Sequence, residues 1–226
     1  MKTNIIYFEK LFFKNVFIIL SKILSEYQVV LVSGGNSIKR IFNKSSNKET
    51  IKKSIKIILS DERIYSNLDD NRTNYYSLKK TLFSKFKFLK LEFIYFSLGK
   101  GDKIIAQSSY LKIKDKIPKV AILSLGSDGH ICSIFKFSEN RRYNKYIDIV
   151  NPKRKVKRIT INTNYLKKIK KIYFIVNGSQ KGHTLNKIIR GKKTNFPLNL
   201  SNKITFILDK AAFQKVKKNK NICLKK

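Results

Sequence analysis

Several segments of the chain are almost uninterrupted runs of β-branched and other apolar residues. Four of them are VVLVS at 29–33, IKIILS at 55–60, VAILSL at 120–125 and IYFIV at 172–176. This composition fits strands of a parallel sheet covered on both faces, because neither row of side chains then meets water. Stretches with helical spacing lie between the runs, and the alternation predicts an α/β sheet with right-handed crossovers.

The alternation extends along the whole chain. Strands are expected at 29–33, 56–60, 92–96, 120–125, 158–161, 172–176 and 204–208, and helices at 11–24, 37–43, 72–83, 103–112, 179–190 and 209–216. No repeat or Pro-rich linker divides the chain, so we expect a single domain over 1–226. Its sheet should be mostly parallel with helices on both faces, and 136–157 should be a surface excursion.

Charge is the most extreme property of the composition. The chain has 50 Lys and Arg against 14 Asp and Glu, a formal net charge of +36. Such an excess of positive charge is typical of proteins that bind nucleic acid or an anionic membrane. Only eight of the basic residues are Arg, the residue that nucleic-acid readers favour. An A+T-rich coding sequence gives the same excess of Lys, so no nucleic-acid binding is expected, and a polyanion partner stays the alternative.

Membrane, metal and cofactor signals are weak. The longest uncharged apolar stretch near the N-terminus, 16–20, is far shorter than the roughly 20 residues of a membrane span, and no cleavage signal follows it. Cys132 and Cys223 form no CxxC pair, so neither a zinc site nor a disulfide is expected. Neither GxxxxGK[ST] nor GxGxxG occurs. We expect a cytoplasmic protein that does not bind a membrane and uses no metal or cofactor.

Four of the nine glycines fall in two loops that directly follow predicted strands. The first loop, SGGNS, contains Gly34, Gly35, Asn36 and Ser37. Its amides, the Ser37 hydroxyl and the positive end of a helix expected to begin near Ile38 would form a phosphate cradle. An ordinary tight turn capped by Ser37 is the alternative.

The second loop, GSDGH, holds Asp128 and His130 just past the strand at 120–125. The chain has only two histidines, and a histidine at a strand end is well placed to act as a general base. Asp128 would orient the imidazole or bind a substrate hydroxyl. The alternative is a helix-capping Asp beside an incidental His. His183 lies in a helical stretch and is expected to be structural or exposed.

A third cluster, SDER, ends the strand at 56–60 and brings Asp61 and Arg63 to the same sheet edge. The carboxylate pair of Asp61 and Glu62, together with the Arg63 guanidinium, suits hydroxyl and phosphate recognition, although a solvated turn is the alternative. The segment NRTN at 71–74 opens a helix and could reach the same crevice.

The order of these motifs resembles the 6-phosphogluconolactonase family. SGGNS, SDER with NRTNY, LGSDGHICSIF, RITINTNYL, NGSQKGHTL and ILDKAAF follow in family order over about 29–213. The combination of GSDGH with SDER is the specific part. The resemblance implies a sheet fold shared with glucosamine-6-phosphate deaminases and ribose-5-phosphate isomerases.

The resemblance also implies hydrolysis of 6-phospho-D-glucono-1,5-lactone to 6-phospho-D-gluconate in the oxidative pentose phosphate pathway. His130 matches the proposed base that activates water, and Asp128 matches the acidic residue before it. The residues matched to substrate or phosphate binding are Gly34, Gly35, Asn36, Ser37, Asp61, Arg63, Arg158 and Lys181. The expected partner is the small sugar-phosphate lactone, and the chain should be a monomer or weak dimer.

Some positions depart from the family pattern without removing an obvious chemical group. They are Ile38 and Lys136 where Pro is usual, Thr73 in place of Ser, and Cys132 in place of Ala. The related deaminases carry a catalytic glutamate shortly after DGH, whereas the next acid here is Glu139. This favours a lactonase. The alternatives are a sugar-phosphate isomerase or glucosamine-6-phosphate deaminase on the same fold, or a basic polyanion-binding protein with a vestigial site.

Overall fold

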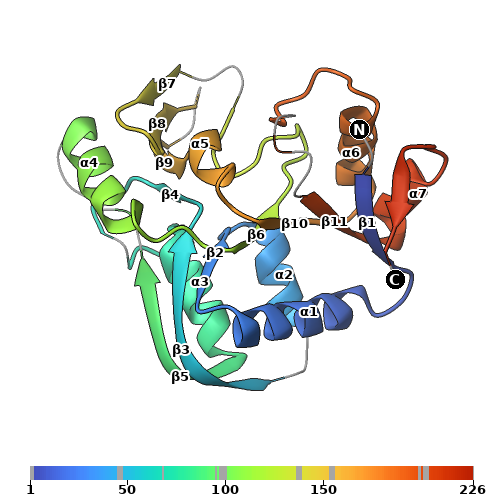
Figure 1. Cartoon of the computed structure of the whole chain (residues 1–226), viewed down its shortest axis with the longest axis horizontal. Helices are drawn as coiled ribbons and strands as arrows, with labels where there is room; N and C mark the ends of the chain where they lie inside the picture. Colours follow the sequence, from blue (N-terminus) through green and yellow to red (C-terminus); the bar gives the residue numbers. More distant parts are fainter. Residues whose placement is uncertain are drawn as a thin grey trace.

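A parallel sheet forms the centre of the computed structural model, which describes residues 3–44, 48–67, 69–94, 96, 101–135, 139–152, 156–197, 200 and 204–225. Its eight strands have the order β12-β1-β11-β10-β6-β2-β3-β5, and every pairing is parallel (Figure 1). The strands are β1 (Thr3–Phe8), β2 (Val29–Val32), β3 (Glu49–Leu59), β5 (Phe86–Ile94), β6 (Val120–Ser124), β10 (Lys171–Val176), β11 (Ile204–Asp209) and β12 (Ile222–Leu224).

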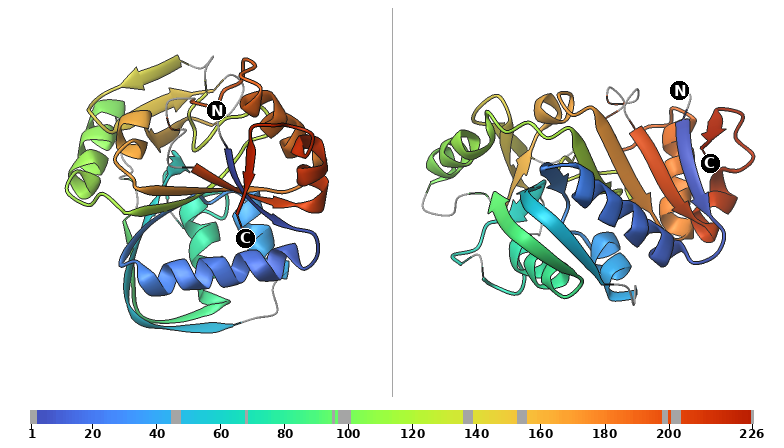
Figure 2. Two further views of the ribbon diagram at one scale, coloured as in Figure 1. Left: turned by 45° about the vertical axis from the view of Figure 1, so that its right-hand side comes forward. Right: turned by 60° about the horizontal axis from the view of Figure 1, so that its bottom comes forward.

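Helices cover both faces of this sheet, as the sequence predicts. The helices that the structure describes are α1 (Phe12–Glu26), α2 (Asn36–Lys44), α3 (Asn74–Phe83), α4 (Asp102–Ile113), α5 (Thr163–Leu166), α6 (Ser179–Ile189) and α7 (Lys210–Val216). The chain steps from β2 to β3 to β5 in one direction and from β10 to β11 in the other. Right-handed crossovers therefore place α2 and α3 on one face and α6 on the opposite face, as Figure 2 shows.

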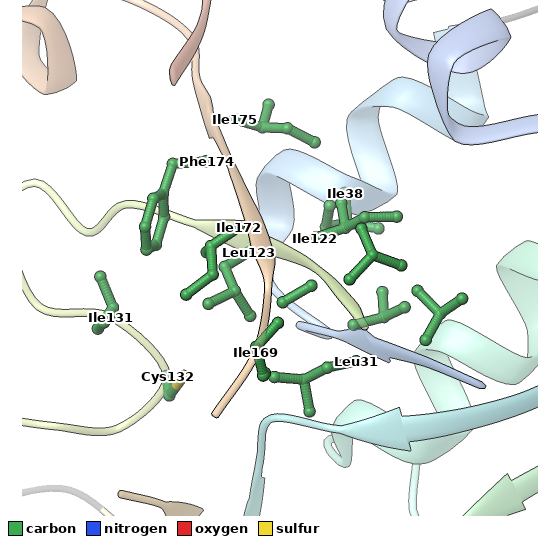
Figure 3. Packing of buried hydrophobic residues seen from close by; sticks show 14 of the residues in the cluster. Leu31, Ile38, Ile122, Leu123, Ile131, Cys132, Ile169, Ile172, Phe174 and Ile175 are labelled. Carbon is green, nitrogen blue, oxygen red and sulfur yellow. The ribbon is translucent and has the colours of Figure 1, made fainter. Parts of the chain in front are cut away.

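The apolar runs form the core, because both faces of the central strands are enclosed. Leu31 of β2, Leu123 of β6 and Ile175 of β10 have no exposed surface. Figure 3 shows Ile38 of α2 on one side of these strands, with Phe174 and other apolar side chains on the other. Successive residues of a strand point to opposite faces, so each run fills both layers at once.

A second, antiparallel sheet corrects one prediction. It has the order β4-β9-β8-β7, with β4 (Asp61–Arg63), β7 (Glu139–Arg142), β8 (Ile147–Asn151) and β9 (Arg158–Ile161). The segment 158–161 was expected in the parallel sheet, but it pairs antiparallel with β4 and β8. Its Ile159 and Ile161 are fully buried like the residues of the central strands, so its apolar positions alone do not separate the two sheets.

The other differences are shifts of boundaries and strands that the sequence analysis did not include. The chain opens with β1, which lies between β11 and β12 and precedes the predicted N-terminal helix. The segment predicted at 92–96 begins six residues earlier, at Phe86, and residue 95 lies outside the described residues. The excursion 136–157 contains β7 and β8, with 136–138 and 153–155 outside the described residues. In the described part of the chain, no helix is both long and apolar enough to span a membrane.

Candidate active site

The strand order reverses direction between β2 and β6, and this is where the two glycine loops meet. The chain leaves β2 toward α2 on one face, whereas the crossover from β6 leads to β10 in the other direction. The Ser33 hydroxyl accepts a hydrogen bond from the Ser124 amide at 3.1 Å, which ties the two strand ends together. A Cβ on Gly35 would lie 3.6 Å from the Ser124 hydroxyl oxygen. Ligands of open α/β sheets bind in the crevice at such a switch point.

The SGGNS loop leads into α2 two residues earlier than the sequence suggests. Helix α2 begins at Asn36, so Ser37 lies inside its first turn and does not precede the helix. The Ser37 hydroxyl donates to Asn177 Oδ1 at 3.0 Å and accepts from Lys181 Nζ at 2.7 Å. Asn36 is exposed beside it. The structure thus brings Lys181, from α6, directly against the first turn of α2.

Lys181 carries its charge in a partly enclosed place. Burial, and to a smaller extent the nearby positive charge of Arg40, together lower the pKa of Lys181 to about 8. Arg40 is exposed on α2, one turn after Ser37. Two cations and the start of a helix therefore converge here, an arrangement that favours a bound anion.

Asn177 and Arg40 were not among the predicted site residues. Asn177 directly follows β10, and its place at the carboxyl end of a strand, where ligands gather, is its only signal in the sequence. Arg40 is three residues after Ser37, which is the spacing of one helical face. Both signals are present in the sequence but are too common to stand out.

Asp61 lies inside a hydrogen-bonded network and not on an open surface. It is 7% exposed, and its two carboxylate oxygens accept from the hydroxyls of Ser60 and Ser133, each at 2.7 Å. Arg158 Nη1 in turn donates to Ser133 Oγ at 3.3 Å. The structure therefore joins Asp61 and Arg158 through Ser133, a residue that the sequence analysis did not select.

Arg63 is held by the helix that follows the SDER segment. Its Nη1 donates to Asn74 Oδ1 at 2.8 Å and to the carbonyl oxygen of Arg72 at 2.9 Å. Asn74 also packs against Gly34, where any Cβ would overlap its side chain. Glycine at 34 is thus required by this close approach. The prediction that 71–74 reaches the crevice is confirmed for Asn74, whereas Arg72 pairs with Asp70.

His130 and Asp128 form a hydrogen-bonded pair at the end of β6. Nδ1 of His130 lies 2.5 Å from Asp128 Oδ1, and the same oxygen accepts from the His130 amide at 3.2 Å. Burial raises the pKa of Asp128, but the charge and hydrogen bonds of His130 outweigh this and leave that pKa below its ordinary value. The imidazole packs against Gly126, where a Cβ would overlap the ring. The side chain of His130 stays 27% exposed.

An aromatic ring connects this pair to Arg158. The Phe135 ring centroid is 4.5 Å from that of His130, and the Arg158 guanidinium lies 5.6 Å from the Phe135 centroid. Nε of Arg158 is buried without a hydrogen-bond partner among the residues that the structure describes. His183, by contrast, is exposed on α6, as expected. Among the described residues no group of three or more His, Cys, Asp or Glu could hold a metal ion.

Residues 20–206 match the family model described as "Glucosamine-6-phosphate isomerases/6-phosphogluconolactonase". The chain belongs to this family. It is 28% identical over 212 residues to 6-phosphogluconolactonase 3 of Saccharomyces cerevisiae (strain ATCC 204508 / S288c), an alignment that covers 83% of this chain and 84% of the relative. The motif order from which the sequence analysis inferred this family is thereby confirmed as a family relationship.

Solved structures of the family share the fold. The crystal structure of 6-phosphogluconolactonase from Thermotoga maritima superposes with a TM-score of 0.73 at 23% identity, covering 92% of this chain and 99% of the other. A monomeric glucosamine-6-phosphate deaminase superposes with a TM-score of 0.72 at 14% identity, covering 94% and 100%. At such identities the likeness supports the fold and does not separate a lactonase from a deaminase.

Proposed function

We propose that the protein hydrolyses 6-phospho-D-glucono-1,5-lactone to 6-phospho-D-gluconate, a step of the oxidative pentose phosphate pathway. The observation that carries the proposal is the pairing of His130 with Asp128 at the same switch point as the Ser37–Lys181 contact. A base and an anion site on neighbouring strand ends suit a phosphorylated substrate with a reactive carbonyl. The names of the yeast and Thermotoga relatives support the same activity.

The phosphate group would bind at the start of α2. The loop of Gly34 and Gly35, the Ser37 hydroxyl and the ammonium of Lys181 surround this place, with Asn36 beside it. Lys181 is the cation best placed for this role because it already donates to Ser37. A phosphate dianion there would stabilise the charged form of Lys181 and offset the cost of its burial.

His130 would act as the general base. Asp128 Oδ1 would accept a hydrogen bond from Nδ1 of His130, which leaves Nε2 of the same imidazole free to accept a proton. Nε2 takes a proton from water as the water oxygen bonds to the lactone carbonyl carbon. The tetrahedral intermediate then collapses by breaking the bond to the ring oxygen, which receives the proton from Nε2. Anchoring the phosphate makes this attack effectively intramolecular.

Arg63 and Arg158 would hold the remainder of the substrate. The buried Nε of Arg158, which lacks a partner in the described part of the chain, is a donor available to a carbonyl or hydroxyl oxygen. Both oxygens of Asp61 are already engaged by Ser60 and Ser133. We therefore assign Asp61 the task of orienting Ser133 and Arg158, in place of the direct substrate contact that the resemblance implies.

The proposal is tested by lactone hydrolysis coupled to 6-phosphogluconate dehydrogenase, after subtraction of spontaneous ring opening. His130→Ala should lower kcat by on the order of 10²- to 10⁴-fold, the usual effect of losing a general base. His183→Ala is the matched control and should retain wild-type kcat. A folded His130→Ala protein with wild-type turnover would exclude His130 as the base.

The same preparation separates the alternatives. A glucosamine-6-phosphate deaminase would release ammonia from glucosamine 6-phosphate, whereas the lactonase should not. A polyanion-binding protein would bind nucleic acid with an affinity that falls steeply with salt. Ammonia release with no lactone hydrolysis above background would refute the proposed function.

A further inference from the structure

The segment 191–197, which follows α6, crosses the turn that carries Asp128 and His130. The backbone amide of Asn195 donates to the carbonyl oxygen of Asp128 at 3.4 Å. Thr194 packs against Gly129, where a Cβ would lie 3.1 Å from the Thr194 Cβ. The two segments are far apart in sequence but in direct contact at the candidate active site.

This segment is anchored in the core by one aromatic residue. Phe196 is 5% exposed, and its ring centroid lies 5.6 Å from that of Phe174 and 6.1 Å from that of Phe206. The Phe196 amide donates to Thr194 Oγ1 at 3.3 Å, which fixes the turn before it. Asn195, between these two residues, is therefore held in place relative to β10 and β11.

The side chain of Asn195 completes the hydrogen bonding of the Asp128 carboxylate. Its Nδ2 donates to Asp128 Oδ2 at 3.0 Å, while Oδ1 of the same carboxylate faces His130 Nδ1. Each carboxylate oxygen thus has its own partner. The resulting chain of contacts runs from Asn195 through Asp128 to His130.

We propose that Asn195 is a positioning residue for His130. It fixes the plane of the Asp128 carboxylate, so that Oδ1 faces Nδ1 of the imidazole and the neutral ring carries its proton there. This leaves Nε2 unprotonated and able to take a proton from water, and in this respect the inference rests on the proposed lactone hydrolysis.

The Asp128 carboxylate needs a second hydrogen-bond partner besides His130 because its side chain is exposed to solvent. Its side chain is 49% exposed, and the terminal torsion of an aspartate has a broad, shallow preference. A half-exposed carboxylate bound through one oxygen alone can rotate and exchange its partner for water. The amide of Asn195, held by the buried Phe196, prevents that rotation.

Two variants test the inference. Asn195→Ala removes the donor, and Asn195→Asp keeps the shape but presents an acceptor to Asp128. Each should lower kcat by on the order of 10-fold, less than the 10²-fold that a 1 Å misplacement causes, with KM changed less than twofold. Asn15→Ala, on α1, is the matched control and should retain wild-type kcat. Thermal unfolding confirms that the variants fold.

The second readout is the nitrogen NMR spectrum of the imidazoles at neutral to mildly alkaline pH. The chain has only His130 and His183, so the exposed His183 serves as an internal reference, and His183→Ala assigns the signals. In the wild type His130 should show one tautomer with the proton on Nδ1. In both Asn195 variants the His130 shifts should move toward the averaged values of His183.

The two readouts separate failure of the inference from failure of the function. Unchanged kcat and an unchanged His130 tautomer in folded Asn195 variants would overturn the positioning role. If the wild type does not hydrolyse the lactone, the proposed function fails, and the tautomer measurement alone decides whether Asn195 positions His130. A reduced Tm with wild-type kcat and tautomer would assign Asn195 a structural role and would likewise overturn the inference.

Discussion

Replacing Lys181 by Met should make the protein more stable and less able to bind phosphate. Burial is the main reason that the pKa of Lys181 falls from 10.5 to about 8. At 1.36 kcal/mol per pKa unit this shift corresponds to about 3 kcal/mol of unfavourable free energy in the folded state below pH 8. Met removes that cost but also the hydrogen bond to Ser37, worth about 1 kcal/mol. The net gain at pH 7 should be about 2 kcal/mol, a Tm increase of roughly 4–8 °C for a chain of this size.

The assay is thermal unfolding at pH 7 with and without inorganic phosphate, followed by steady-state kinetics. Phosphate should raise the Tm of the wild type by binding the folded state and should have little effect on Lys181→Met. The variant should show a KM about 10- to 100-fold higher, which corresponds to losing one hydrogen bond to a charged group. Its kcat should change less than its KM, because Lys181 is proposed to bind the phosphate and not the reacting carbonyl.

The sign of the pH dependence gives an independent check. Because the folded pKa of Lys181 is below the unfolded value, the unfolded state binds more protons between pH 8 and 10.5. The wild type should therefore gain stability over this window relative to Lys181→Met. Lys22→Met, at a side chain that is 76% exposed on α1, is the control and should leave the Tm nearly unchanged. A Lys181→Met protein that is less stable at pH 7 and binds substrate normally would refute the argument.

Two further predictions concern the neighbouring loops. Gly126→Ala should displace the His130 ring, because the new Cβ would overlap it, and should lower kcat by on the order of 10²-fold; unchanged turnover in the coupled assay would contradict this contact. Burial raises the pKa of Glu62 to about 6, so this carboxyl favours folding by about 2 kcal/mol below pH 4.5, an effect that is lost as the pH rises through 6. Urea unfolding between pH 4 and 7 should show this decline in the wild type and a smaller one in Glu62→Gln, and equal slopes would exclude Glu62 as its source.

The central sheet could be predicted from sequence because its strands are enclosed on both faces. Such strands carry uninterrupted apolar runs, as in β2, β6 and β10. The antiparallel sheet could not be recognised in the same way. Its strand β4 is the polar tripeptide at 61–63, which forms a strand only through pairing with β9, about 100 residues later. Long-range pairing of this kind leaves no local pattern.

The candidate site was predictable where glycine or histidine marked a strand end. Gly34 and Gly126 are needed for close approach of other side chains, and His130 is one of two histidines. The asparagines that bind Ser37 and Asp128 were not predictable. Asn177 meets Ser37 across 140 residues, and Asn195 meets Asp128 across 67. Asparagine is common in this chain, so only the contacts in the folded structure distinguish Asn177 and Asn195 from the others.

The contact between Lys181 and Ser37 also has a consequence for biosynthesis. Ser37 follows an early strand, whereas Lys181 belongs to a helix that is translated 144 residues later. The neighbours β2, β6 and β10 are made in that order, and each joins the sheet only after the chain between them has been synthesised. A nascent chain that ends before α6 therefore lacks the proposed phosphate anchor even if its first half has folded. Phosphate binding should appear only when α6 has left the ribosome. Phosphate binding by nascent chains of increasing length would therefore show at which length the sheet is assembled as far as β10 and α6.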